Sequence, residues 1–237
     1  MCSPAAVAIP ETLWAIVPVK PFAEGKSRLG LAEAERGAVN RAFMIHVLDV
    51  VGALLPGSRI VIVSRDREAL AIAAARGVRG LSEPSGSDLN DALTQGAGYV
   101  QALGADAVLS ISTDLPHLTP GDARAMIAAF APDGAVFAPD EREVGTNAIL
   151  MRPMAMPYRH GVGSLASHLS AAEQAQISPI LVRRPGLARD VDTRFAYRAL
   201  FREETPNALI RAASAMASEA NAIFRERSGM AMSARAI

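Results

Sequence analysis

Three segments of this chain are apolar on both faces, and they restrict the class of fold that it can adopt. They are residues 13–19, 59–64 and 107–112. A strand that is apolar throughout needs cover on both sides, as in a parallel sheet between two layers of helices. Helix-like segments follow each strand, as crossover connections between parallel strands require. We therefore expect an α/β protein, a three-layer α/β/α sandwich with a mixed, mostly parallel sheet.

Hydrophobic periodicity and capping residues predict the remaining elements. Further strands are expected at 78–81, in two runs within 134–151 around a charged turn, and at 177–182. Helices are expected at 32–54, 68–76, from Asp88, from Thr119-Pro120, at 165–175, from 192 or 193 to 201, and at about 206–226. Because no linker divides the chain, we expect one domain over 1–237, with an N-terminal extension at 1–12 and a C-terminal helix and tail at 206–237.

The balance of charges argues against nucleic acid and membrane surfaces as partners, because both require a strongly positive electrostatic field. The chain has 24 Lys and Arg against 24 Asp and Glu, so we expect no nucleic acid and no membrane surface as a partner, but a small ligand at a local site. The one cysteine, Cys2, excludes a disulfide framework within the chain. Without a signal peptide or an apolar span of about 20 residues we expect a cytoplasmic protein. A homodimer that packs through the C-terminal helix is compatible with the sequence.

Ligands of open α/β sheets bind beyond the carboxyl ends of the strands. This rule selects the loops after Val19, Leu81, Ser112 and Leu150. Unusual residues lie in or near three of these four loops. We therefore expect the functional residues to come from this edge of the sheet.

The loop after the first strand is rich in cations. It carries Lys20, Lys26 and Arg28 against one acid, Glu24. Three cations at the mouth of a sheet suit a polyphosphate. The loop has neither the Walker A pattern nor a dinucleotide fingerprint. The alternative is a solvated loop whose charges keep the surface wet.

Three acids are candidate metal ligands. Asp114 directly follows a buried strand, where Mg²⁺ would find a carboxylate beside phosphate oxygens; the alternative is a helix cap, a role that Thr119 already fills. Asp190 and Asp192 lie two apart in an extended segment, so they should point to opposite faces and at most one should face the metal. The alternative there is that Asp192 or Thr193 caps the next helix.

Two glycine-containing motifs could hold an anion. They are Gly145-Thr146-Asn147 and Gly161-Val162-Gly163-Ser164. Glycines let backbone amides approach an anion, and Ser164 would open a helix whose N-terminus attracts phosphate or carboxylate. An ordinary turn with a serine cap is the alternative. His168, one turn beyond Ser164, either lines this pocket or packs in the core.

Taken together, these motifs resemble one enzyme family. Pro18-Val19-Lys20-Pro21, Lys26-Ser27-Arg28-Leu29, Asp114-Leu115-Pro116 and the two glycine motifs with His168 are similar, over residues 13–203, to the 2-phospho-L-lactate guanylyltransferase family. That family includes the bacterial phosphoenolpyruvate and 3-phospho-D-glycerate guanylyltransferases. The resemblance implies a nucleotidyltransferase (nucleotide-diphospho-sugar transferase-like) fold. It also implies GTP and a small phosphorylated acid as substrates, pyrophosphate as product, Mg²⁺ (or Mn²⁺) as cofactor, and a step in making the deazaflavin coenzyme factor 420.

The resemblance also assigns roles to individual residues. The family has Gly-Leu-Asn where this chain has Asp88-Leu89-Asn90, which keeps the asparagine but changes the residue that opens its helix. The predicted roles are: catalytic, Lys20, Lys26, Arg28 and Asp114; nucleotide-binding, Pro18, Lys20, Lys26, Arg28 and Asn90; acceptor-binding, Thr146, Gly161 and Ser164; metal-binding, Asp114, Asp190 and Asp192.

Other functions remain open at this point. A sugar-phosphate or molybdopterin nucleotidyltransferase would share the fold and the acid after the strand. A glycosyltransferase of similar fold usually carries Asp-x-Asp, whereas Asp114 has no second Asp two residues away. A non-catalytic GTP-binding module would bind nucleotide without releasing pyrophosphate.

Overall fold

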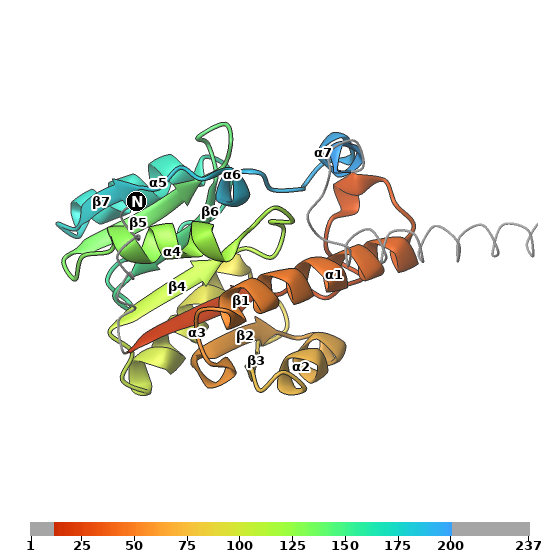
Figure 1. Ribbon diagram of the computed structural model, residues 1–237, viewed down its shortest axis with the longest axis horizontal. Helices are drawn as coiled ribbons and strands as arrows, with labels where there is room; N and C mark the ends of the chain where they lie inside the picture. The colour runs from red at the N-terminus through yellow and green to blue at the C-terminus, as the bar shows by residue number, and fades with distance from the viewer. Residues whose placement is uncertain (1–11, 201–237) are drawn as a thin grey trace, which may run out of the picture.

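A single mixed sheet organises the protein (Figure 1). The computed structural model describes residues 12–200, and seven strands pair there in the order β3-β2-β1-β4-β6-β5-β7. β6 runs antiparallel to both of its neighbours, whereas the other pairs are parallel. The strands are β1 (Leu13–Pro18), β2 (Ile60–Ser64), β3 (Arg79–Ser82), β4 (Ala107–Ile111), β5 (Gly134–Pro139), β6 (Thr146–Met151) and β7 (Ser178–Leu181).

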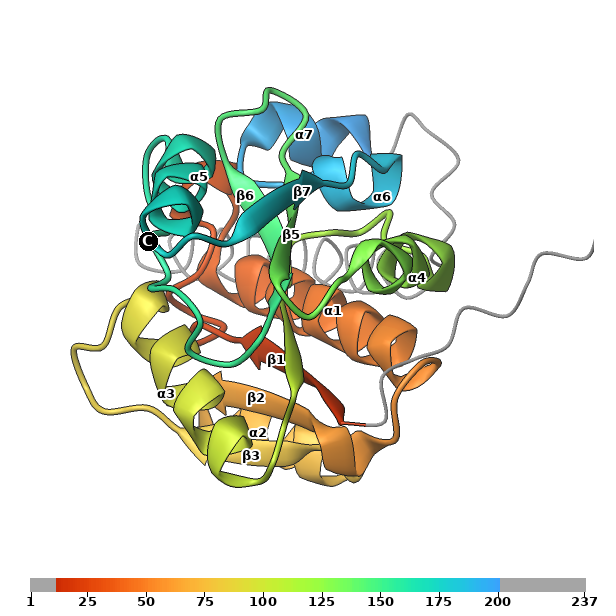
Figure 2. The same cartoon turned by 90° about the vertical axis from the view of Figure 1, so that its left-hand side faces the viewer.

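Helices cover both faces of the sheet, which confirms the predicted three-layer sandwich. In Figure 2, α1 and α4 lie on one side and α3 and α5 on the other. None of the helices in residues 12–200 has the length and apolar character that a membrane crossing requires. The helices are α1 (Glu33–Gly52), α2 (Arg67–Ala74), α3 (Leu89–Ala102), α4 (Pro120–Ala129), α5 (Ser164–Gln174), α6 (Pro185–Ala188) and α7 (Arg194–Ala199), with short 3-10 turns η1 (Ser27–Leu29) and η2 (Gly57–Arg59).

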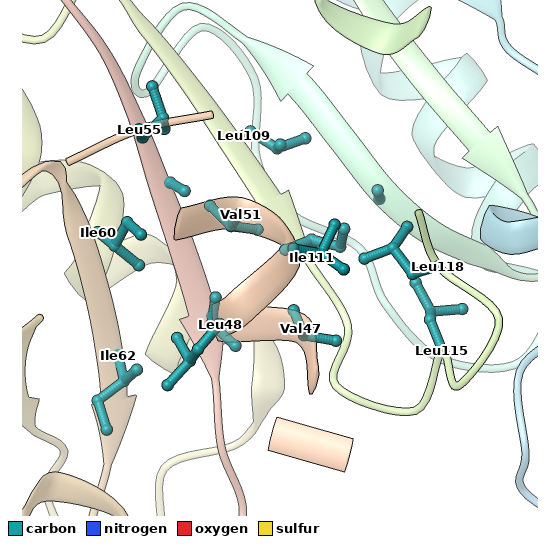
Figure 3. Close-up of a cluster of buried hydrophobic side chains, with 14 of the residues drawn as sticks. Val47, Leu48, Val51, Leu55, Ile60, Ile62, Leu109, Ile111, Leu115 and Leu118 are labelled. Atoms are coloured by element: carbon teal, nitrogen blue, oxygen red, sulfur yellow. The ribbon is translucent and has the colours of Figure 1, made fainter. Parts of the chain in front are cut away.

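Alternation along the strands divides the core into two layers. Leu13, Ala15 and Val17 of β1 pack with α1, α2 and α4, while Trp14 and Ile16 pack with α3 and α5. Successive residues of a strand point to opposite faces, so both layers need apolar partners from every central strand. Figure 3 shows the first layer, in which side chains of α1 lie against those of β2 and β4.

Three helices begin at capping residues that the sequence predicted. Asp88 forms a capping box with Asp91 at α3, and Thr119 forms one with Asp122 at α4. Thr193 caps α7 through the amide of Ala196. Of the two residues that could have capped this helix, Thr193 therefore has the role, and Asp192 is available to the site.

One element differs from its prediction, and others lie outside residues 12–200. The loop after Leu150 was expected at the ligand edge, but β6 is antiparallel, so it starts at that edge and ends at the opposite one. The tight connection from β5 forces this reversal, and the chain returns to the ligand edge by Gly161. The expected helix at 206–226, the tail to 237 and the first eleven residues lie outside the described residues.

Two glycines of α3 offer a matched test of packing against the sheet. A Cβ on Gly96 would lie 2.9 Å from Ile16 Cγ2 and 3.1 Å from Val63 Cγ2, whereas one on Gly98 would meet nothing within 4 Å. We expect Gly98→Ala to stabilise the protein by up to about 1 kcal/mol through helix propensity. Gly96→Ala should destabilise it by about 1–2 kcal/mol because overpacking outweighs the same gain. Urea denaturation of both variants measures the difference, and equal effects would contradict this packing.

Candidate functional site

A hollow of about 340 Å³ opens at the edge where β1 and β4 end and β6 begins. Loops that are distant in sequence form its wall, because parallel strands bring their carboxyl ends to one edge. The predicted residues that line it are Pro18, Lys20, Lys26, Asp114, Thr146, Gly161, Ser164, Asp190 and Asp192. Most of the predicted site is therefore gathered in one place.

Three carboxylates meet at this hollow. One oxygen from each of Asp114, Asp190 and Asp192 lies within 4.8 Å of the others. The backbone amide of Val191 donates to the Asp114 carbonyl at 3.0 Å and holds the two segments together. The expectation that only one of Asp190 and Asp192 faces the site is wrong. The segment is bent, since the Asp190 amide donates to Ala188 O at 3.3 Å, and alternation holds only for extended backbone.

The acid cluster fits a divalent cation of the Mg²⁺ or Mn²⁺ kind. Asp114 Oδ1 is buried and has no hydrogen-bond partner among the described residues. A buried carboxylate oxygen without a partner is costly, because its desolvation is uncompensated. Oxygen ligands from carboxylates are those that Mg²⁺ and Mn²⁺ prefer. Asp114, Asp190 and Asp192 thus have the chemistry that the predicted metal needs.

Lys26 lies directly against these acids. Its Nζ is 3.4 Å from Asp114 Oδ2 and 3.3 Å from Asp192 Oδ1, and it donates to Val191 O at 2.7 Å. The Lys26 side chain is only 8% exposed, and its ammonium lies 5.5 Å from the centre of the Phe43 ring. The lysine therefore places a positive charge in direct contact with the cluster.

The cluster changes the proton affinity of its members in opposite directions. Burial alone would raise the pKa of Asp114, but the Lys26 charge and hydrogen bonds from its neighbours outweigh burial and lower it. Burial and the charges of Asp114 and Asp192 raise the pKa of Asp190 to about 6. Asp114 is therefore ionised at neutral pH, whereas burial and the Asp114 charge raise the pKa of Asp192 as well as that of Asp190.

The raised pKa of Asp190 predicts a pH-dependent loss of stability. Its pKa is about 6 in the folded protein against an ordinary 3.8, so the unfolded chain ionises first as the pH rises. The metal-free protein should therefore lose stability between about pH 4 and pH 6 and stay less stable above it. Asp190→Asn should be more stable than the parent at pH 7.5, by on the order of 1 kcal/mol after allowance for solvent screening.

Urea denaturation with a chelator present, at pH 4 and pH 7.5, tests this expectation. The gain from Asp190→Asn should shrink at pH 4, where the carboxyl is protonated in the folded protein. Asp133→Asn removes an exposed carboxylate in the turn before β5 and serves as the control, with no such pH-dependent gain. A gain from Asp190→Asn that is equal at both pH values would contradict the raised pKa.

Two hydroxyls and a glycine loop, the predicted acceptor seat, line the same hollow. The backbone amide of Thr146 donates to Ser164 Oγ at 3.0 Å. Ser164 is the first residue of α5 and not its cap, which is Gly163 with φ 70°. Gly161 has φ 151°, a conformation that favours glycine. His168 is fully buried and stacks on Phe137 at 6.1 Å, so it packs behind the seat.

Two predicted residues lie apart from the others. Arg28 lines a neighbouring hollow of about 550 Å³ that shares Asp140, Asp190 and Asp192 with the first. Arg28, which belongs to η1, therefore does not line the hollow that Lys20 and Lys26 line. Asn90 does not line either hollow; its amide donates to His160 O at 3.1 Å and accepts from His160 N at 2.7 Å, which anchors the glycine loop.

Several residues of the wall had no role predicted from the sequence, among them Asn147 and His160. Asn147 Nδ2 donates to Leu187 O at 2.9 Å and fixes α6, which leads into the acid segment. His160 Nε2 is buried without a partner among the described residues. Each is adjacent to a residue with a predicted role, Thr146 or Gly161, and Asn147 also belongs to the Gly145-Thr146-Asn147 motif.

The chain is similar in sequence to guanylyltransferases. A family described as "Guanylyl transferase CofC like" matches residues 13–194. The chain is 37% identical over 185 residues to a phosphoenolpyruvate guanylyltransferase of Sphaerobacter thermophilus, covering 77% of this chain and 89% of the relative. It is 31% identical over 182 residues to a 2-phospho-L-lactate guanylyltransferase of Methanothermobacter thermautotrophicus, covering 76% and 79%.

Solved structures support the fold. A nucleotidyl transferase from Methanothermobacter thermautotrophicus superposes with a TM-score of 0.54 at 16% identity, covering 81% of this chain and 96% of that one. A CMP:2-keto-3-deoxy-manno-octonic acid synthetase superposes with a TM-score of 0.51 at 11% identity, covering 80% and 97%. At such identities the likeness concerns the fold alone, which is the predicted nucleotidyltransferase-like fold.

Proposed function

This chain belongs to the CofC-like guanylyl transferase family, and we propose that it transfers GMP from GTP to a small phosphorylated carboxylic acid with release of pyrophosphate. The acceptor is phosphoenolpyruvate, 2-phospho-L-lactate or 3-phospho-D-glycerate, and the product enters the biosynthesis of the deazaflavin coenzyme factor 420. Relatives named for the first two acids support this acceptor class. As a family member the protein is a nucleotidyltransferase.

One observation carries the proposal. The same hollow is lined by a three-carboxylate cluster with Lys26 on one wall and by the Thr146, Gly161 and Ser164 seat on another. A nucleotidyltransferase needs both parts, because a triphosphate and a second anion must come within bonding distance. A site for nucleotide binding alone would have no use for the second seat.

The chemistry needs little beyond positioning and charge neutralisation. The phosphate of the acceptor has a second pKa of about 6, so at neutral pH it is largely a dianion and needs no general base. One of its oxygens forms a bond to the α-phosphorus of GTP while the bond to the bridging oxygen breaks and pyrophosphate leaves. Thr146, Gly161 and Ser164 hold the acceptor, and Lys20 and Lys26 neutralise charge on the triphosphate.

The acid cluster completes the assignment. Asp114, Asp190 and Asp192 would hold Mg²⁺ or Mn²⁺, which when bound neutralises phosphate charge and polarises the phosphoryl groups. Arg28 neutralises charge from the neighbouring hollow. Asn90 contributes to nucleotide binding indirectly, by fixing the loop that contains His160.

An assay of pyrophosphate release tests the proposal. The purified protein is incubated with GTP, Mg²⁺ and each of the three phosphorylated acids, and the product mass is determined. We expect pyrophosphate only when one of the acids is present, and a product heavier than the acid by one guanylyl group. Release that requires a sugar phosphate or molybdopterin would overturn the acceptor class. GTP binding without release under any condition would identify a non-catalytic module.

A further inference from the structure

His168 makes two hydrogen bonds behind the acceptor seat, one from each ring nitrogen. Its Nε2 accepts from the backbone amide of Arg159 at 2.9 Å, and its Nδ1 lies 3.1 Å from Thr146 Oγ1. The imidazole is fully buried. Its edge meets the His160 ring, with ring centres 4.7 Å apart. The ring is thus fixed between the glycine loop and β6.

These contacts determine which nitrogen carries the proton. A backbone N–H can only donate, so Nε2 must be the unprotonated, accepting nitrogen. Burial, with the nearby charges of His160 and Arg159, lowers the pKa of His168 to about 3, and the ring is neutral at neutral pH. A neutral ring with an unprotonated Nε2 carries its hydrogen on Nδ1. The Ser164 carbonyl, which also acts as a hydrogen-bond acceptor for this ring, favours the same tautomer.

The tautomer in turn sets the direction of the Thr146 hydroxyl. A protonated Nδ1 cannot accept, so Thr146 Oγ1 receives a hydrogen bond from the ring and must donate its own proton elsewhere. No residue within 12–200 accepts that proton, and Thr146 lines the hollow. Ser164 Oγ is in the same position, since it accepts from the Thr146 amide at 3.0 Å. Both hydroxyls can therefore donate into the hollow.

We propose that His168 is a positioning residue that turns Thr146 into an obligate donor toward the acceptor acid. This inference rests on the proposed function, because it names the anion that the seat recognises. Hydroxyl protons that are directed into the seat favour the fully ionised phosphate or carboxylate, since a protonated oxygen would place its own hydrogen against them. The first turn of α5 adds the positive end of its dipole at the same place.

Two substitutions separate this role from packing. In His168→Asn the amide nitrogen takes the place of Nδ1, so the donor to Thr146 is kept and the acceptor for Arg159 is lost. In His168→Gln the longer side chain reaches the position of Nε2, so the acceptor for Arg159 is kept and the donor to Thr146 is lost. Each variant therefore loses one buried hydrogen bond, and thermal melting should show similar losses of stability.

Steady-state kinetics then give the decisive comparison. We expect His168→Gln to raise KM for the acceptor acid roughly 10- to 100-fold, while KM for GTP stays unchanged, because hydrogen bonds to charged groups are strong. His168→Asn should retain most of the acceptor affinity. In a Thr146→Val background, His168→Gln should cause little further loss. Equal losses in the Asn and Gln variants, or additive losses with Thr146→Val, would overturn the inference.

A measurement on the unmodified protein guards against variants that fail to fold. Long-range ¹H–¹⁵N NMR of the histidine rings distinguishes the two neutral tautomers and the cation. We expect a signal from a fully buried ring protonated at Nδ1 alone and unchanged from pH 6 to pH 8. Protonation at Nε2, or a cation in this range, would overturn the inference even if the protein shows no turnover. Absence of turnover with all three acids would instead overturn the proposed function.

Discussion

Replacing Asp114 with asparagine is expected to lower kcat/KM for GTP-dependent pyrophosphate release about 10³-fold. Asp114 is the member of the acid cluster whose pKa is lowered, and its Oδ1 is buried without a hydrogen-bond partner among residues 12–200. An amide keeps the shape of the side chain but removes the charge that would hold the cation. Loss of that cation costs several kcal/mol of transition-state stabilisation.

Asp106 provides a matched control for this change. It lies just before β4, whereas Asp114 lies just after it, so the two carboxylates stand at opposite edges of the sheet. Asp106→Asn should leave kcat/KM within about 2-fold of the parent, in keeping with the small effects of exposed substitutions. Near-normal turnover in a folded Asp114→Asn variant would contradict the metal assignment.

Replacing Lys26 with methionine is expected to have two opposite effects. Lys26→Met should lower kcat/KM about 10²-fold, because an ammonium that neutralises the triphosphate is lost. In the absence of nucleotide it should bind Mn²⁺ more tightly than the parent, since Lys26 Nζ lies within 3.4 Å of Asp114 and 3.3 Å of Asp192 and repels a second cation there. Calorimetric titration with Mn²⁺ measures the second effect independently of turnover.

Arg28→Met is the matched control for Lys26→Met, because it removes a positive charge from the same loop but from a different hollow. Arg28 lines the neighbouring hollow, whose wall includes Asp192 but not Asp114, and within residues 12–200 no ion pair joins Arg28 to the acids that Lys26 contacts. Its replacement should leave Mn²⁺ affinity unchanged and reduce kcat/KM less than the Lys26 variant does. Weaker Mn²⁺ binding by Lys26→Met would show that the lysine supports the cation site and does not compete for it.

The sequence predicted most of the fold because local chemistry specified it. Strands apolar on both faces required a covered sheet, and Asp88 and Thr119 marked helix starts that are confirmed. Asp114 could be selected because it follows a buried strand at the edge where ligands bind. Lys20 and Lys26 could be selected from the same rule, and both line the hollow.

The remaining differences depend on long-range geometry that no local pattern contains. The antiparallel direction of β6 follows from its pairing with β4 and β5. Which strands pair is decided by the folded sheet and not by a local sequence pattern. The bend at Asp190 depends on α6, a four-residue helix too short to show a helical period. Arg28 has the residue type expected for a phosphate contact, but η1 determines where its side chain lies.

The central claim is that the acid cluster and the acceptor seat serve a single reaction in one hollow. The most direct test is a crystal structure of the protein with Mn²⁺, a non-hydrolysable GTP analogue and the acceptor acid. We expect an anomalous manganese peak among Asp114, Asp190 and Asp192, with the acid on Thr146 and Ser164 and its phosphate facing the α-phosphorus. Manganese bound elsewhere, or an acid bound in a different hollow from the nucleotide, would contradict the claim.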